Sequence, residues 1–196
     1  DLQADLFNSI DVARSAAMVG EVIAATFIGF ALTLLFGGAL VDSIGMKRVL
    51  YFAAFAYVAG SVLVFFAVGA GSYWLVYIGF LCTGLGWGAV EAATNPLITT
   101  VYPDEKTHRL NILHAWWPAG IVVGGIAGLG LESIGFGWEV NLALLLIPGL
   151  VLAWLGSRAV VPVTERVARG ITSEEMFSQL VKSPGFFVWV VCMMGT

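Results

Sequence analysis

The chain of 196 residues is 59% hydrophobic and only 11% charged, and its mean hydropathy is +0.93. A soluble domain is about 25% charged, so this composition excludes a soluble globular class and indicates a protein embedded in lipid. The net charge is −4, and the sequence has no signature of a nucleic-acid-binding protein. The two cysteines are not part of a Cys/His cluster, so neither a disulfide framework nor a zinc site is expected, and no cofactor is implied.

Five apolar segments are long enough to cross a bilayer, which needs about 20 helical residues. Gly, Pro or charged residues bound each segment, and short connections make consecutive segments antiparallel neighbours. The 24 glycines fit such a bundle because small residues let membrane helices approach closely. The predicted helices are Ser15–Phe36, Val49–Val68, Tyr73–Thr100, Leu110–Leu131 and Trp138–Leu155. The sequence therefore predicts an all-α fold, a polytopic transmembrane helical bundle.

The composition changes after the fifth predicted helix. Residues 158–184 include four of the basic residues and a proline, which is typical of a linker, and a short amphipathic helix is expected at Glu174–Val181. We predict a transmembrane bundle at 1–157, a linker at 158–184 and the start of a second bundle at 185–196. The first residue is not Met, and the last apolar run is too short to span a bilayer, so we expect a piece of a longer protein.

The basic residues lie almost entirely on one side of the predicted bundle. Eight of the nine follow the first, third or fifth helix, and Arg14 alone precedes the first. By the positive-inside rule the side with eight charges is cytoplasmic. We call this side the basic end. The expected location is the plasma membrane, a bacterial inner membrane, with the lipid bilayer as a partner and several spans.

The loop after the first predicted helix contains a motif with clear physical roles. Gly45 can adopt a positive φ for a turn, Gly38 allows close helix packing, and Asp42 can accept hydrogen bonds. Two basic residues then anchor at the level of lipid phosphates. The motif residues are Gly38, Asp42, Gly45, Lys47 and Arg48. An ordinary tight loop with basic anchors is the alternative interpretation.

This loop, GALVDSIGMKR, resembles the GxLxDxxGxKR signature of the major facilitator superfamily. The resemblance implies that the five spans are helices two to six of the N-terminal half, and that the first helix and the C-terminal half lie outside this chain. It also implies alternating access around a midplane site between the halves, with the motif residues at the cytoplasmic gate. Many members have an arginine four residues before Gly84, but this chain has Phe80 there, so that partner for Asp42 is missing.

The third predicted helix contains a carboxylate, Glu91, about nine residues or roughly 13 Å from its basic end. A charge at this depth is costly in hydrocarbon, and such groups usually mark an ion or solute path. Asn95 is one turn further on and shares the face of Glu91. The next helix is antiparallel, so Trp117 reaches a similar depth and His114 lies a turn nearer the basic end. An acid, an amide, an imidazole and an indole can therefore line one cavity.

The pattern ExxxNP followed by RLN resembles the fucose:proton symporter family and its glucose/galactose relatives. The resemblance implies proton coupling at Glu91, with a small-molecule solute and a proton as partners. The chain departs from that family at His114 and at Trp116-Trp117, where the fucose symporter has polar amides, so the substrate does not carry over. The predicted solute-cavity residues are Asn95, His114, Trp117, Asn111 and Trp87.

Each candidate also has a structural interpretation. Glu91 could pair with a buried base, His114 could bond a neighbouring backbone, and the tryptophans could serve only in packing. Glu21 is expected to lie near the outer interface, in contact with water. The rows Gly84/Gly88 and Gly120/Gly124/Gly128 are interpreted as helix-contact faces.

The predicted function is secondary active transport, namely proton-coupled uptake of a sugar or similar small polar solute. The alternative is a drug or metabolite efflux antiporter of the same fold. Gly120 and Gly124 match part of a drug-antiporter motif, but Gly125 replaces its proline, which argues against efflux. No HExxH, GxSxG or paired-Asp motif occurs in the spans, so an enzyme is not expected.

Overall fold

A computed structural model describes residues 2–185, 188 and 192 of the chain. A short turn of wide helix, η1 (Gln3–Phe7), leads into α1 (Asn8–Ile10). The remaining helices are α2 (Ser15–Ile44), α3 (Met46–Gly69), α4 (Tyr73–Val101), α5 (Lys106–Ser133), α6 (Trp138–Arg158), α7 (Glu165–Ala168) and α8 (Ser173–Lys182). Most of the predicted start of a second bundle, 185–196, lies outside the described residues.

The five predicted membrane helices are confirmed. Helices α2 to α6 are each long and apolar enough to cross a bilayer, and each contains one of the predicted segments. The helices are longer than predicted because their polar ends stay helical; α2, for example, continues through the motif to Ile44. A helix also forms where the amphipathic one was expected, as α8. The division into bundle and linker at 157/158 stays a prediction.

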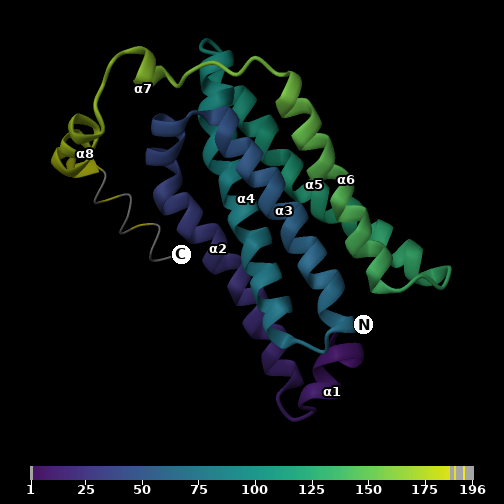
Figure 1. The fold of residues 1–196 in the computed structure, drawn as a ribbon. Helices are drawn as coiled ribbons and strands as arrows, with labels where there is room; N and C mark the ends of the chain where they lie inside the picture. The colour runs from purple at the N-terminus through teal and green to yellow at the C-terminus, as the bar shows by residue number, and fades with distance from the viewer. Residues whose placement is uncertain (1, 186–187, 189–191, 193–196) are drawn as a thin grey trace.

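Three helices form the packed part of the bundle. Helices α2 and α3 both pack along α4, and α6 covers the outer side of α3 (Figure 1). One buried apolar cluster joins the three helices near the basic end and includes Val41, Val49 and Ala89. A second cluster at the opposite end joins η1 to α2, α3 and α4. The packed helices therefore hold together over their whole length.

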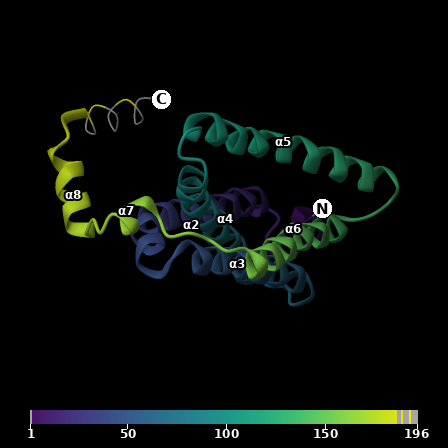
Figure 2. The same cartoon turned by 90° about the horizontal axis from the view of Figure 1, so that it is seen from above.

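Helix α5 stands apart from this packed group. Seen from above, α5 runs along one side of the molecule, apart from α2 and α3 (Figure 2), and it packs far less closely on α4 than those two helices do. None of its described residues is buried. The predicted contact face at Gly120, Gly124 and Gly128 is accordingly wrong for the described chain. No atom lies within 4 Å of a Cβ placed on Gly120 or Gly124, and at Gly128 there is only the side chain of Asn141, at 3.6 Å.

The predicted contact face at Gly84 and Gly88 is confirmed. A Cβ on Gly84 would overlap the backbone oxygen of Thr26, and one on Gly88 would lie 2.6 Å from the oxygen of Phe30. Among the described residues no atom lies within 4 Å of a Cβ placed on Gly38, so close packing at this residue stays a prediction. Its neighbour Gly37 makes a close approach, since a Cβ on that residue would lie 2.6 Å from the Cβ of Ala92.

We expect Gly84→Ala to destabilise the protein, because the new methyl group must push the backbones of α2 and α4 apart. Overpacking of this kind costs about 1–3 kcal/mol. The measurement is the thermal unfolding midpoint of the purified full-length protein in detergent. Gly20→Ala is the matched control, since a Cβ at that helical position meets open space. Equal midpoints for the two variants would contradict the close contact.

Candidate functional site

A cavity of about 440 Å³ opens between α2, α4 and α5. Helix α4 supplies its charged residue, and the two flanking helices supply most of its aromatic surface. The lining residues are Phe27, Phe30, Trp87, Val90, Glu91, Thr94, Leu113, His114 and Trp117. Four residues predicted for the site, Trp87, Glu91, His114 and Trp117, therefore lie around one space.

The polar part of the cavity centres on the carboxylate of Glu91. Asn95, one helical turn further along α4, donates from Nδ2 to Oε1 of Glu91 at 3.2 Å. From α5, Nδ1 of His114 lies 3.7 Å from the same oxygen. The Glu91 side chain is 30% exposed and that of His114 is 53% exposed. The carboxylate is thus largely enclosed by its neighbours and still accessible from the cavity.

Aromatic rings form the other wall. The indoles of Trp87 and Trp117 are stacked, with centroids 6.2 Å apart and planes at 16°. Phe30 packs on Trp87 with a centroid distance of 4.3 Å, and Phe27 meets it edge-on. Trp87 thus has a packing role and also lines the cavity. Flat apolar ring faces beside a carboxylate and an imidazole can contact a solute that has both CH-rich faces and hydroxyl groups.

Two predicted cavity residues lie elsewhere. Asn95 does not line the cavity, and its Oδ1 is buried without a partner among the described residues. Asn111 is exposed on α5 and also lies outside the lining set. The sequence prediction missed Phe27 and Phe30. Their spacing of three residues on α2, opposite the Gly84/Gly88 face, was the available signal.

At the basic end, Asp42 of the loop motif is bound by the linker. Thr164 Oγ1 and Arg166 Nε each donate to one of its carboxylate oxygens at 2.5 Å. The side chains of Arg166 and Asp42 are only 17% and 10% exposed. The linker therefore supplies the arginine that is absent at Phe80. Sequence reasoning missed this pair because 124 positions separate its members.

The rest of the motif has mixed surroundings. Gly45 has a φ of +89°, as predicted, and ends α2. Lys47 was expected at the level of lipid phosphates, but its ammonium donates to the carbonyl oxygens of Ser157 and Ala159 at the end of α6. A cation is favourable there because a helix C-terminus presents unpaired carbonyls. Arg48 is exposed.

A second ion pair joins α7 to the start of α5. Lys106 Nζ donates to Glu165 Oε1, and Arg169 lies 3.9 Å from the other oxygen of the same carboxylate. The hydrogen bond from Lys106 holds the pKa of Glu165 below its usual value. Helix α7 is therefore tied both to the loop motif and to the start of α5.

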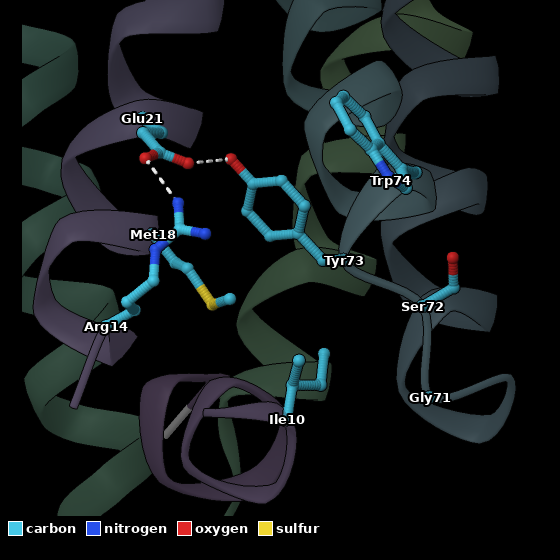
Figure 3. Close-up of a pocket in the computed structure, with 8 residues that line it drawn as sticks. All are labelled: Ile10, Arg14, Met18, Glu21, Gly71, Ser72, Tyr73 and Trp74. Atoms are coloured by element: carbon cyan, nitrogen blue, oxygen red, sulfur yellow. Dashed lines mark hydrogen bonds and ion pairs between the residues drawn. The ribbon is translucent and has the colours of Figure 1, made fainter. Parts of the chain in front are cut away.

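A cavity of about 470 Å³ lies at the opposite end of the bundle. Figure 3 shows the residues that line it. Glu21 of α2 accepts hydrogen bonds there from the Tyr73 hydroxyl of α4 and from the Arg14 guanidinium. The Glu21 side chain is 42% exposed, which agrees with its expected contact with water. These bonds tie α2 to α4 at the end opposite Asp42.

Comparisons with known proteins agree with the fold. The family model described as Major Facilitator Superfamily matches residues 6–196. The chain is 31% identical over 131 residues to myo-inositol transporter 1 of Saccharomyces cerevisiae, covering 66% of this chain and 22% of that protein. It is 28% identical over 152 residues to the hexuronate transporter of Bacillus subtilis, covering 76% and 35%.

A third relative is the L-fucose-proton symporter of Escherichia coli, with 26% identity over 113 residues, covering 57% of this chain and 26% of that protein. A multidrug resistance protein is also similar. No solved structure matches. The chain thus spans between about a fifth and a third of the length of these three transporters. With five spanning helices and a family match along nearly its whole length, this chain belongs to the major facilitator superfamily of multi-pass membrane transporters.

Proposed function

We propose that the protein takes up a sugar or similar small polar solute together with protons, by alternating access. The observation that supports this most is the cavity beside Glu91, where a carboxylate and an imidazole face stacked indoles. A carboxyl group in a membrane bundle can bind and release a proton as its surroundings change, which is what coupling requires. Glu91 is the proposed coupling residue, and His114, Trp87 and Trp117 are the proposed solute contacts.

The relatives favour this function over efflux. The three similar transporters are named for the solutes myo-inositol, hexuronate and L-fucose, the last with a proton. All three solutes have six-carbon skeletons with several hydroxyl groups, which suits a wall of ring faces beside hydrogen-bonding groups. Efflux remains the second candidate because a multidrug resistance protein is also similar. The direction of transport separates the two.

We expect Glu91→Gln to abolish proton-driven accumulation, because the amide cannot take up a proton. The measurement uses the full-length protein in vesicles, with labelled L-fucose, myo-inositol and D-glucuronate, with and without an inward proton gradient. Glu132→Gln is the matched control, since that carboxylate is exposed near the end of α5. Accumulation should be lost in the first variant and kept in the second.

Two other outcomes would contradict the proposal. Accumulation that is independent of the gradient and unchanged in Glu91→Gln would make this carboxylate structural. Gradient-driven release of a hydrophobic drug, without uptake of any of the three solutes, would support the efflux alternative.

For the basic end we propose a cytoplasmic gate in which α7 holds the loop motif. Asp42 binds the linker through Arg166 and Thr164, and Lys47 binds the end of α6. These contacts join the adjacent ends of α2 and α3 to the end of α6 and to the chain that follows it. A movement of α2 and α3 relative to that chain must therefore break them. The gate residues from the motif are Gly38, Asp42, Gly45, Lys47 and Arg48, and their cytoplasmic location is part of this proposal.

We expect Asp42→Asn to slow transport with little change in solute affinity, because it weakens the gate and leaves the cavity intact. A charge-assisted hydrogen bond contributes about 1.5–3 kcal/mol, so the turnover rate should fall by roughly tenfold. Arg166→Gln should have a similar effect. Arg169→Gln is the control, since the Arg169 side chain is 72% exposed. The measurement is the rate and the KM of uptake; loss of solute binding in Asp42→Asn would contradict the gate.

The ion pair between Lys106 and Glu165 gives the linker a pH dependence. The pKa of Glu165 is lowered in the folded protein, so its contribution is complete above the unfolded carboxyl pKa and is lost as pH falls through the folded value. We expect the contact between α7 and the start of α5 to open in acid. A spin-label distance between α7 and the start of α5, measured from pH 7 downward, should lengthen. Glu165→Gln should remove the pH dependence of this distance.

A further inference from the structure

The cavity drawn in Figure 3 has no part in the proposed transport steps. It lies at the end of the bundle opposite the basic end, where α1 and the starts of α2 and α4 meet. Its volume of about 470 Å³ is similar to that of the cavity beside Glu91. We call it the Glu21 cavity, and its polar and aromatic lining residues are Arg14, Glu21, Ser72, Tyr73 and Trp74.

The Glu21 cavity and the solute cavity lie on different sides of α2. Glu21 lines the first and Phe30 lines the second. These residues are nine positions apart, which is about two and a half helical turns, so their side chains leave the helix on opposite faces. The Glu21 cavity is therefore a separate site and not the mouth of the solute cavity.

The face of α2 that continues from Glu21 into the membrane is apolar. Ile28, Leu32 and Leu35 follow Glu21 by 7, 11 and 14 positions, so they share its face, and all three are exposed in the described chain. An exposed aliphatic strip of this kind suits the acyl chains of lipids. At the rim of the cavity, Trp74 is exposed, and tryptophan is enriched where a bilayer meets water. The cavity thus lies where an acyl-chain strip meets the polar interface.

The Glu21 cavity carries one charge of each sign. The guanidinium of Arg14 lies 3.1 Å from the carboxylate of Glu21, and both side chains are exposed. Glu21 also accepts a hydrogen bond from the Tyr73 hydroxyl. Because a guanidinium has five N–H donors and a carboxylate accepts about four hydrogen bonds, each charged group has capacity for a further partner. A ligand that itself carries one charge of each sign complements this pair.

We propose that the Glu21 cavity binds the headgroup of phosphatidylethanolamine from the leaflet opposite the basic end. The phosphate lies beside Arg14, and the ammonium lies beside Glu21 and the ring face of Trp74, so charges of opposite sign alternate around the cavity. The Ser72 hydroxyl donates to a phosphate oxygen. The acyl chains follow the aliphatic strip of α2. Binding here depends neither on proton coupling nor on the direction of transport.

The test is lipid retention by the full-length protein, measured by native mass spectrometry. The protein in detergent is mixed with equal amounts of phosphatidylethanolamine and phosphatidylglycerol that have the same acyl chains. Arg14→Gln removes the phosphate contact and should lower the binding of both lipids, whereas Glu21→Gln removes the ammonium contact and should lower that of phosphatidylethanolamine alone. We expect each loss to be about fivefold, because charge contacts at an exposed site are weaker than buried ones.

The matched control is Arg169→Gln, which removes an exposed guanidinium at the basic end and should leave the retention of both lipids unchanged. If either charge variant fails to fold, Trp74→Leu replaces it, since the exposed Trp74 side chain lies outside the two buried apolar clusters. This variant should lower the retention of phosphatidylethanolamine more than that of phosphatidylglycerol.

Two results would overturn the proposal. One is wild-type retention of phosphatidylethanolamine in the variants at Arg14, Glu21 and Trp74. The other comes from glycerophosphoethanolamine, the same headgroup without acyl chains. Retention of this compound as strong as that of the lipid would make the cavity a site for a soluble phosphodiester, whereas we expect it to bind far more weakly because it lacks the contact with the aliphatic strip.

Discussion

The close approach of α2 and α4 determines where the cavity lies and what lines it. Because Gly84 and Gly88 have no side chain, the backbone of α2 rests directly on α4 at Thr26 and Phe30. At this separation the Phe30 ring packs on Trp87, with ring centroids 4.3 Å apart. Glu91 follows Gly88 by three residues, slightly less than one helical turn, so it lies at the edge of that contact. Longer side chains in the contact would separate the helices and change both walls.

The helices of the packed group are tied at both ends by polar contacts and in between by apolar packing. Glu21, Tyr73 and Arg14 join α2 to α4 at one end, and Asp42 and Arg166 join the loop motif to the linker at the other. Helix α5 has no buried residue and yet provides His114 and Trp117. The cavity thus has one wall that is part of the core. Its other wall could shift at a small cost in buried area, as opening and closing around a solute would require.

The sequence predicted the spans well because each is a long apolar run with charges or Gly at its ends, which is the pattern that a membrane-spanning helix requires. It also placed Glu91, His114 and Trp117 together, since helical rise and antiparallel order alone set their depths. It did not predict the position of α5, because depth says nothing about the distance between helices. The sequence also did not predict the pairing of Asp42 with Arg166, since that contact depends on the path of the linker. Asn95 was assigned to the cavity from its spacing, but i and i+4 residues can bond each other and need not share a ligand.

Asp42 of the loop motif and Glu91 of α4 have partners of different kinds, and the difference matches their proposed roles. Asp42 faces a guanidinium, which is charged at every accessible pH, so neutralising Asp42 would leave a poorly exposed cation without its partner. Its contact suits a fixed connection that breaks only when the elements move. Glu91 faces an amide and an imidazole, neither of which must be charged. The contacts of Glu91 therefore need no fixed charge on either partner, which suits its proposed role in coupling.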